Sequence, residues 1–271
     1  GDWEKLRQWS EQNDRFAIIG GSFIGSELAA ALASNGKKVV MVFPEACVGA
    51  LVFPADLSQS LCAYYAERGV RVVSGRMVEG IEEAGGARRL HIGDGQTVDV
   101  DRIAAGVGIV PETALARDAG MDVDNGILVD HNLRTSQPDV YAAGDVARFY
   151  NPLLEKKLRV EHEDNALKMG TAAGANMAGA DEPYEYLPFF YSDLFDVGYE
   201  AVGELGGELE SVTDLRDPRG KGCVFYLRNR RVRGVIFWNL FGNVEAGRRL
   251  IARPGPLSEE DLRVWADNEL T

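Results

Sequence analysis

The chain has 271 residues, of which 45% are hydrophobic and 26% charged, a composition typical of a globular protein with room for two domains. Its 42 acidic residues outnumber its 29 basic residues, and a net charge of −13 repels phosphate backbones and anionic lipids. No apolar run approaches the roughly 20 residues that span a bilayer. We therefore expect neither nucleic-acid binding nor membrane insertion.

The cysteines indicate the compartment in which the chain works. Cys47, Cys62 and Cys223 are far apart in the sequence and form no CxxC pair. This pattern predicts free thiols in a reducing compartment, the cytoplasm, and argues against a redox-active disulfide within these residues. The first residues show no basic-then-apolar leader, so no secretion signal is expected.

The first 114 residues alternate between strand and helix patterns. Residues 1–12 predict a lead-in helix with Trp3, Leu6 and Trp9 on one side. The strands predicted next are 15–20, 38–43, 70–74 and 102–106, and the helices are 22–35 and 55–68. Residues 77–99 alternate around two glycine-containing turns, which predicts an antiparallel excursion in place of a crossover helix.

The rest of the chain predicts a different kind of structure. A linker and a Gly-Asp loop follow residue 113, and a small-residue helix is expected over 165–177. Residues 222–240 alternate around an Asn229-Arg230 turn, which predicts a β-hairpin, and helices are expected at 245–252 and 259–268. Strands followed by helices predict an α+β module. We interpret the hairpin's arginines as a solvated edge that deters strand pairing: Arg228, Arg230, Arg231 and Arg233.

A glycine-rich turn follows the first predicted strand and opens the first of the Ala-rich helices. It reads Gly20-Gly21-Ser22-Phe23-Ile24-Gly25. Gly20 allows the tight turn, and Gly25 lets the helix pack close to the strand. The pyrophosphate of a dinucleotide would lie on the N–H groups at the helix start, where the Ser22 hydroxyl would also donate to it. The strand and helix around the motif favour NAD(H) binding over a structural turn without a ligand.

Two acidic residues near this turn are candidate cofactor contacts. The acid expected at the end of the second strand is absent, because Phe43 stands there and Glu45 follows it. A carboxylate at Glu45 would repel a 2′-phosphate and favour NAD over NADP; the alternative is a solvated loop residue. Glu27 would bond the nicotinamide carboxamide, or is simply a first-turn acid that the helix dipole stabilises. Phe23 would lie over the nicotinamide or cap the core.

A second nucleotide signal lies in residues 135–147, where a predicted strand ends in Ala143-Gly144-Asp145. Gly-Asp loops are common turns, but a strand leading into this one favours a flavin site. His162 stands in a polar cluster before a helix, and by itself it is most simply a residue of the helix N-terminus. The three histidines of the chain are scattered, and we expect no metal site.

Several phrases together resemble the apoptosis-inducing factor family of FAD-dependent NADH oxidoreductases, within the pyridine nucleotide-disulfide oxidoreductase superfamily. They are IIGGSFIGSELAAAL, VVMVFPE, AAGVGIVPE, VYAAGDVARFY, RVEHEDNALKMGTAAGANM, YSDLFDVGYEAVG and GKGCVFYLRNRRVRGVIFWNLF. The resemblance implies an α/β fold with a Rossmann-like NAD(H)-binding domain over 13–133. It further implies the C-terminal part of an FAD-binding domain over 134–182 and a C-terminal α+β domain over 183–271.

No second glycine fingerprint precedes these phrases. We therefore expect a fragment that lacks the N-terminal half of the FAD domain. Such a fragment would bind NAD(H) weakly and retain little FAD, because affinity falls when a ligand loses its enclosing surface.

The resemblance also implies which residues hold the cofactors. Asp145 would bond the ribityl chain of FAD, and His162 and Glu163 would lie near its isoalloxazine ring. Phe23 and Glu27 would meet the nicotinamide, and with His162 they are the catalytic candidates for hydride transfer from NADH to flavin. Contacts with NAD(H) are implied at Gly21, Ser22, Phe23, Ile24, Glu45, Gly108, Glu161, His162, Tyr191, Glu200 and Asn239.

Other functions stay open at this point. The electron acceptor is a quinone, an iron–sulfur protein, oxygen or another protein partner. An NAD(H)-responsive scaffold that dimerises through its C-terminal domain without turnover would use the same nucleotide-site residues. A ferredoxin or rubredoxin reductase relative would differ in partner rather than in mechanism, and the C-terminal phrases favour the first interpretation over it. In a eukaryote, we expect a mitochondrial location.

Overall fold

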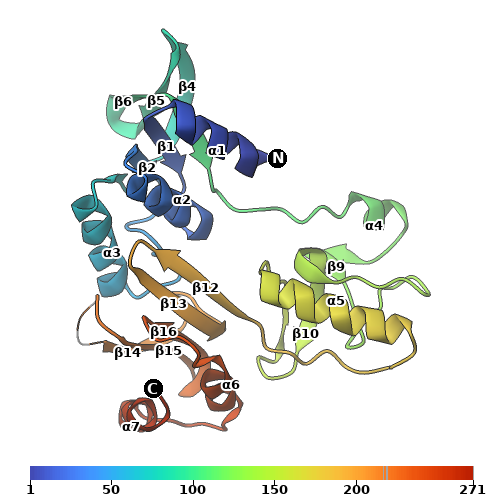
Figure 1. Ribbon diagram of the computed structural model, residues 1–271. Coiled ribbons are helices and arrows are strands. Elements are labelled where there is room, and N and C mark those ends of the chain that lie inside the picture. The colour runs from blue at the N-terminus through green and yellow to red at the C-terminus, as the bar shows by residue number, and fades with distance from the viewer. Residues whose placement is uncertain (216, 218, 271) are drawn as a thin grey trace.

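The computed structural model describes residues 1–215, 217 and 219–270, whose strands form three groups along the chain (Figure 1). The first group, blue to green, contains the glycine-rich turn. The second, green to yellow, contains the Gly-Asp loop, and the third, orange to red, is the C-terminal part. Within the described residues, no helix combines the length and the apolar composition that a membrane span needs. The mixture of a parallel sheet with antiparallel sheets confirms the expected α/β fold class.

A four-stranded parallel sheet forms the centre of the first group, in the order β3-β2-β1-β7. The ends of its elements lie within one residue of those expected from the sequence. The carboxyl ends of β1 and β7 lie side by side, which is where a doubly wound sheet binds its ligand. The elements are α1 (Asp2–Gln12), β1 (Arg15–Ile19), α2 (Phe23–Ser34), β2 (Lys38–Val42), α3 (Ala55–Glu67), β3 (Arg71–Val73) and β7 (Arg102–Ala105).

The antiparallel excursion expected between β3 and β7 is present. It is a three-stranded sheet of β4 (Val78–Ala84), β5 (Ala87–Ile92) and β6 (Gln96–Val100). Its inner face packs on the parallel sheet, since Leu90 and Val100 share a buried cluster with Ala17 of β1. The other face of the parallel sheet is covered by helices, as in other α/β folds.

The second group begins after a linker, residues 106–113, that contains neither helix nor strand. Its sheet has the order β11-β10-β9-β8. Because β8 and β9 belong to this sheet, the stretch from 114 to 133 lies with the Gly-Asp loop and not with the parallel sheet. The elements are α4 (Ala114–Asp118), β8 (Val123–Asp124), β9 (Gly126–Leu128), the 3-10 turn η2 (Gly144–Val146), β10 (Ala147–Asn151), β11 (Lys156–Leu158) and α5 (Glu163–Met177).

The third group is a five-stranded antiparallel sheet, in the order β12-β13-β16-β15-β14, followed by two helices. The turn predicted at Asn229 and Arg230 is confirmed, with φ values of 54° and 58° that suit a two-residue hairpin loop. Asp261 N donates to Ser258 Oγ at 3.2 Å, which caps the last helix as expected. The elements are β12 (Phe189–Leu194), β13 (Val197–Gly203), β14 (Glu210–Leu215), β15 (Gly222–Arg228), β16 (Arg231–Trp238), α6 (Val244–Ala252) and α7 (Glu259–Glu269).

The interpretation of the arginine-rich hairpin as a solvated edge is wrong. β15 and β16 are interior strands of the sheet, flanked by β14 and β13. Arg233 is only 5% exposed, and its Nε donates to Glu204 Oε2 at 3.3 Å. Arg228 Nη2 and Lys156 Nζ donate to Glu204 Oε1 at 3.1 and 2.7 Å. Arg228 and Arg233 therefore neutralise the nearly buried carboxylate of Glu204, and the hairpin is not a strand-repelling edge.

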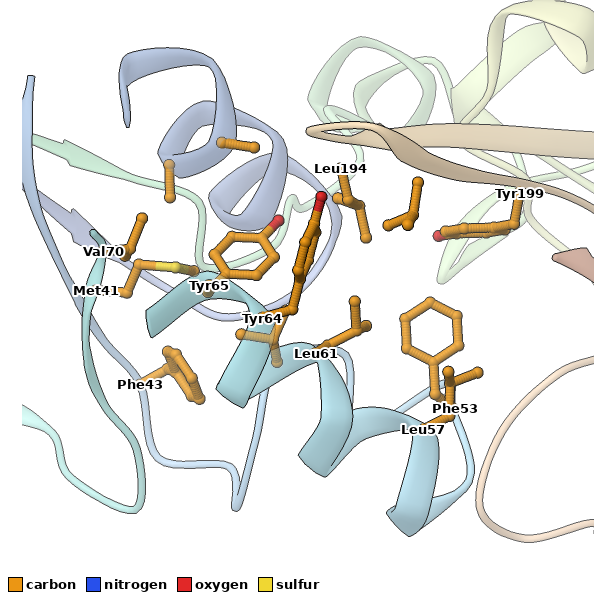
Figure 2. Close-up of a cluster of buried hydrophobic side chains, with 14 of the residues drawn as sticks. Met41, Phe43, Phe53, Leu57, Leu61, Tyr64, Tyr65, Val70, Leu194 and Tyr199 are labelled. Carbon is orange, nitrogen blue, oxygen red and sulfur yellow. The ribbon is translucent and has the colours of Figure 1, made fainter. Parts of the chain in front are cut away.

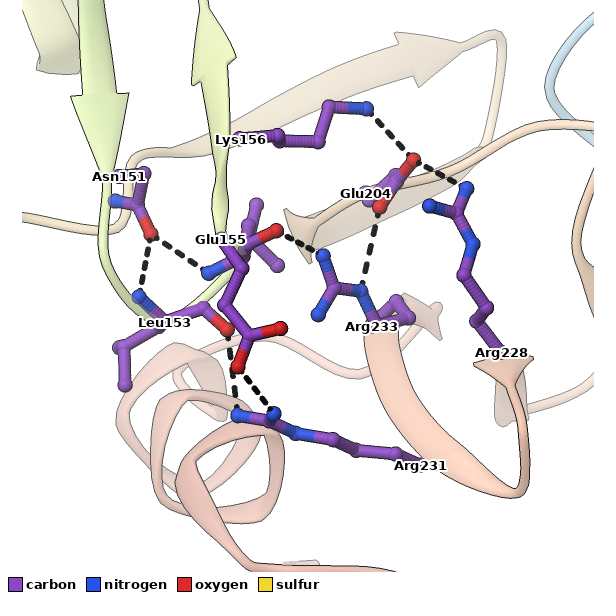
Figure 3. A network of polar contacts seen from close by, with 9 residues as sticks. Asn151, Leu153, Glu155, Lys156, Glu204, Arg228, Arg231 and Arg233 are labelled. Atoms are coloured by element: carbon purple, nitrogen blue, oxygen red, sulfur yellow. Dashed lines mark hydrogen bonds and ion pairs between the residues drawn. The ribbon is translucent and has the colours of Figure 1, made fainter.

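These ion pairs also join the second and third groups (Figure 3). Lys156 comes from β11, whereas Glu204 follows β13. Arg231 in β16 pairs with Glu155 at 2.9 Å, and the Arg233 guanidinium donates to the carbonyl of Leu154. The C-terminal sheet is thus bound to the segment between β10 and β11.

One hydrophobic core joins the parallel sheet, α3 and the C-terminal sheet (Figure 2). Met41 comes from β2 and Phe43 directly follows it, and Leu61 and Tyr65 come from α3. Tyr199 of β13 meets the Phe53 ring edge-on, with 5.2 Å between ring centroids. This continuous core fixes the C-terminal sheet against the nucleotide-binding part, and β12 contacts α2.

Cys47, Cys62 and Cys223 are free in the described residues. Cys47 and Cys62 are distant in the sequence but neighbours in the fold, since Val48 N donates to Cys62 Sγ at 3.2 Å. Burial, reinforced by a hydrogen bond with Cys47, raises the pKa of Cys62 to about 12. Its thiol is therefore protonated at neutral pH and is a poor nucleophile.

Candidate functional site

The glycine-rich turn joins β1 to α2 at the carboxyl edge of the parallel sheet. Gly20 has a φ of 113°, and a Cβ atom there would lie 2.2 Å from Gly106 O. A Cβ atom at Gly25 would lie 2.2 Å from Gly20 O. Neither position tolerates a side chain, so the turn, the helix and the end of β7 approach one another closely.

Phe43 explains why the expected acid is displaced from the end of β2. Its ring is fully buried beneath the turn, and a Cβ atom at Gly21 would lie 2.6 Å from it. A carboxylate in its place would be a buried charge without a partner. Glu45, two residues later, is the first acid after β2, and its side chain is half-buried.

The start of α2 is suited to an anion. The helix begins at Phe23 with Ser22 as its N-cap residue, and the Ser22 hydroxyl makes no capping hydrogen bond. No acidic residue lies in the first turn, so Glu27 belongs to the second turn and the first-turn interpretation of it was wrong. The first N–H groups of a helix have no partner within it and carry the positive end of its dipole. A pyrophosphate fits this arrangement.

A cleft of about 730 Å³ extends from this helix start to the Gly-Asp loop and the C-terminal sheet. It has the size and the mixed apolar and polar lining of a cofactor site. Nine of the expected cofactor residues line it: Ser22, Phe23, Ile24, Glu27, Gly108, Asp145, Glu161, His162 and Tyr191. The other lining residues are Val52, Gly106, Ile109, Leu154, Leu158, Arg159, Val160, Leu187, Pro188, Phe190, Gly203, Glu204 and Leu205.

Aromatic side chains form one wall of the cleft. Phe23 is 41% exposed and Tyr191 is 49% exposed, which is unusual for large aromatic residues. Phe23 meets Phe190 edge-on, with 5.9 Å between ring centroids. Beside them, Glu27 leaves α2 toward the cleft and accepts a hydrogen bond from Ser192 Oγ at 2.5 Å. The wall can therefore offer apolar ring faces and one carboxylate to a planar heterocycle.

His162 lies both at the start of a helix and against the cleft. It is the N-cap residue of α5, and its ring also lines the cleft, 5.3 Å from the Tyr191 ring. Burial lowers the pKa of His162, although the carboxylates of Asp164 and Glu163 oppose the shift, so the ring is neutral at pH 7. Its Nδ1 atom is buried without a hydrogen-bond partner among the described residues. An unsatisfied buried polar atom costs about 1–3 kcal/mol, and a ligand in the cleft would relieve this cost.

The Gly-Asp loop is held in place by Arg159. Arg159 Nη1 donates to Asp145 O at 3.2 Å, and Nε donates to Asn125 Oδ1 at 3.2 Å. The same guanidinium pairs with Glu161, and only 10% of the Arg159 side chain is exposed. Arg159 therefore links the Asp145 loop to the segment that carries His162.

Seven expected cofactor residues do not line the cleft. Three of them form the glycine-rich turn beside it, and the other four are Glu45, Glu163, Glu200 and Asn239; the three in the turn are Gly20, Gly21 and Gly25. The side-chain amide of Asn239 is engaged by the chain itself, since it accepts from Gly198 N and donates to Gly220 O, both at 2.8 Å. Glu200 Oε2 accepts from Gly242 N at 2.8 Å. The cofactor contacts of the expected site residues, inside the cleft and outside it, stay predictions.

Sequence reasoning missed four residues that shape the cleft: Arg159, Phe190, Ser192 and Glu204. Arg159 stands immediately before the polar cluster of residues 160–164, so its position was available as a signal. Ser192 has no local signal, because its partner Glu27 is 165 residues away. No group of three histidine, cysteine or acidic side chains able to hold a metal occurs in the part of the chain that the structure describes.

The chemistry of the cleft fits a dinucleotide and a flavin. A Cβ atom at Gly20 or Gly25 would collide with neighbouring backbone, so the tight turn depends on these glycines, and the helix start next to them offers N–H donors to phosphate. The orphaned Nδ1 of His162 and the exposed Asp145 carboxylate supply polar groups at the opposite end. These are the donor and acceptor types that the two cofactors require.

Comparison with protein families agrees with this geometry. Residues 2–170 match the pyridine nucleotide-disulphide oxidoreductase family, whose members use FAD and NAD(P)H. Residues 173–215 and 210–253 match the C-terminal domain described for the mitochondrion-associated apoptosis-inducing factor.

Curated relatives of several names are about equally similar. Monodehydroascorbate reductase 3 of Arabidopsis thaliana is 34% identical over 96% of this chain and 61% of its own length. Apoptosis-inducing factor 1 of Dictyostelium discoideum is 34% identical over 93% of this chain and 51% of its own length. The ferredoxin–NAD(+) reductase component of the anthranilate 1,2-dioxygenase system of Burkholderia cepacia is 34% identical, over 93% and 62%. The chain thus spans between half and two thirds of the length of these relatives.

Solved structures show the same architecture. A ferredoxin reductase from Rhodopseudomonas palustris superposes with a TM-score of 0.81 at 29% identity, covering 87% of this chain and 59% of that one. Putidaredoxin reductase, in its covalent complex with putidaredoxin, has a TM-score of 0.82 at 27% identity, covering 99% and 67%. The family match extends over more than half of the chain, and the chain therefore belongs to the pyridine nucleotide-disulphide oxidoreductase family, with a C-terminal part of the apoptosis-inducing factor type.

Proposed function

We propose that this chain is the NADH-binding and C-terminal portion of an FAD-dependent NADH oxidoreductase. The observation that carries the proposal is the shared cleft, which brings Phe23 and Glu27 of the nucleotide-binding part toward Asp145 and His162. A bound flavin would supply the acceptor of the hydride from NADH and pass the electrons onward.

The residues of the cleft divide this task by their chemistry. The start of α2 binds the pyrophosphate of NADH, and Glu27 accepts from its carboxamide. Phe23 and Tyr191 cover the nicotinamide and exclude water, which protects a hydride from side reactions. Asp145 bonds the ribityl hydroxyls of FAD, and the neutral ring of His162 completes its hydrogen bonding with a cofactor atom.

Glu45 supports a preference for NADH. It is the first acidic residue after β2, where the adenosine of a dinucleotide lies in such folds. Its carboxylate would bond the ribose hydroxyls of NADH and repel the 2′-phosphate of NADPH.

The cleft does not define the electron acceptor, the oligomeric state or the cellular compartment of the protein. Relatives named for a ferredoxin and for monodehydroascorbate share 34% identity with this chain, so similarity alone does not select the acceptor. We keep a homodimer and a reducing compartment as proposals. For the domains, we propose a nucleotide-binding domain that ends at the linker 106–113, because β8 and β9 pair within the second sheet.

The experiment is NADH-dependent reduction of a dye by the full-length protein that contains this chain, because the chain alone is expected to retain little FAD. We expect Glu27→Ala and His162→Ala each to lower the rate at least about tenfold, since each removes a polar contact with a cofactor. His91→Ala is the control, because His91 lies in β5, outside the cleft, with 43% of its side chain exposed. Wild-type rates in both cleft variants would contradict the assignment of the site.

A further inference from the structure

Ser192 connects the C-terminal sheet to the nicotinamide end of the cleft. It lies in β12, is only 2% exposed, and donates from Oγ to Glu27 Oε1 at 2.5 Å. A short O–H···O⁻ distance of this kind is typical of a hydrogen bond to an ionised carboxylate, which is stronger than one between neutral groups. The contact joins α2 to a strand 165 residues later in the chain.

Tightly packed aromatic residues surround Ser192. Tyr199 stands directly opposite in the register of β12 and β13, and its ring stacks on Trp238 with an interplanar angle of 6°. Burial raises the pKa of Tyr199, and a hydrogen bond with Ser192 opposes that shift. Because Ser192 is itself only 2% exposed and packs against Tyr199, its side chain has little freedom to rotate away from Glu27.

The hydrogen bond from Ser192 occupies only one of the two carboxylate oxygens of Glu27. Oε1 accepts from Ser192, whereas Oε2 has no hydrogen-bond partner among the described residues, and Glu27 lines the cleft beside Phe23. Without Ser192, the three rotatable bonds of a half-buried glutamate would let this oxygen sample many positions.

We propose that Ser192 is a positioning residue that fixes the Glu27 carboxylate, so that its second oxygen accepts from the carboxamide NH₂ group of nicotinamide. This inference rests on the proposed function of the cleft. It also specifies what the site selects, because an ionised carboxylate can only accept hydrogen bonds. A dinucleotide with a carboxylate in place of the carboxamide, nicotinic acid adenine dinucleotide, offers no donor and repels Glu27.

The experiment is calorimetric titration of the chain with three probes: NAD, nicotinic acid adenine dinucleotide, and ADP-ribose, which lacks the nicotinamide ring. We expect Ser192→Ala to weaken NAD binding about three- to tenfold, to leave ADP-ribose binding unchanged and to reduce the preference for NAD over the acid analogue. Ser192→Thr keeps the hydroxyl and should keep that preference.

Ser58→Ala is the matched control. Ser58 is 1% exposed and donates to Val48 O at 2.7 Å, so its loss also removes a buried serine hydrogen bond, but outside the cleft. We expect it to leave the ratio of NAD to ADP-ribose affinity unchanged. Glu27→Gln adds a second test that does not depend on the folding of a Ser192 variant, and it should reduce discrimination against the acid analogue.

The outcomes separate this inference from the proposed function. A wild-type chain that binds neither NAD nor ADP-ribose overturns both. A wild-type chain that binds both, together with a Ser192→Ala variant that loses NAD and ADP-ribose affinity equally or loses neither, overturns the positioning role alone. An unchanged preference in Glu27→Gln also overturns it.

Discussion

A methyl group at Gly25 tests the close approach of α2 to the glycine-rich turn. Gly25 lies within α2, where replacing glycine by alanine ordinarily favours the helix by roughly 1 kcal/mol. At this position, however, the new Cβ atom would lie 2.2 Å from Gly20 O and 2.8 Å from its carbonyl carbon. The atoms in contact are backbone, so the helix start itself has to move.

The structure sets the scale of the effect. Ordinary Cβ contacts begin near 3.4 Å, so the helix start must shift by roughly 1 Å from the turn. Overpacking of this kind costs about 1–3 kcal/mol, which exceeds the gain in helix propensity. A misplacement of about 1 Å at a ligand site commonly costs on the order of 100-fold, and we expect NADH affinity to fall at least about tenfold.

Thermal unfolding and calorimetric titration with NADH measure the two consequences. Gly174→Ala is the control, because Gly174 lies within α5 and a Cβ atom there would meet no atom within 4 Å. We expect the control to keep NADH affinity and to raise the unfolding temperature slightly. A Gly25→Ala protein with unchanged stability and unchanged NADH affinity would refute the close-approach reasoning.

Two further predictions follow from the charges. Glu204→Gln leaves the nearly buried Arg233 beside a neutral amide and should lower the free energy of unfolding by about 1–3 kcal/mol in denaturant titrations. Burial raises the pKa of Glu204, but the hydrogen bond from Lys156 and the nearby arginines outweigh it and lower the pKa overall. The stability of the wild type should therefore fall as the pH drops below about 4.5, where an ordinary glutamate titrates, and the Gln variant should show less of this loss. An identical acid profile in the two proteins would contradict this. Glu45→Gln should raise the affinity for NADPH relative to NADH about tenfold by calorimetry, whereas Glu67→Gln, at an exposed position, should not. Equal ratios of the two affinities in the wild type and both variants would remove Glu45 from the site.

The nucleotide-binding sheet was predictable because its signals are local. Glycine directly follows β1 and β7, and Gly36 and Gly69 stand just after α2 and α3, so these element ends could be placed to within one residue. The turn at Gly20 carries its own geometric requirement, since only glycine avoids the Gly106 carbonyl. The Asn229-Arg230 turn was predictable for a similar reason, because apolar and polar residues alternate on both sides of it.

The errors arose where a partner lies far away in the sequence. In the sequence, the arginines of the β15–β16 hairpin have no visible acidic partner. In the fold, Arg228 and Arg233 both contact Glu204, which follows β13. The aromatic run at 184–199 did not reveal the β12–β13 pairing, because a run of bulky residues fits a buried core in several ways. The bond between Ser192 and Glu27 joins two separate groups of strands, and no local pattern encodes it.

Calorimetric titration of the folded chain with NADH tests whether the cleft beside the glycine-rich turn binds a dinucleotide. We expect a saturable heat of binding, with tighter binding of NADH than of NADPH and weaker NADH binding in Gly25→Ala. A chain whose circular dichroism shows it to be folded, but which gives no binding heat with NADH or NAD, would contradict the assignment of the cleft.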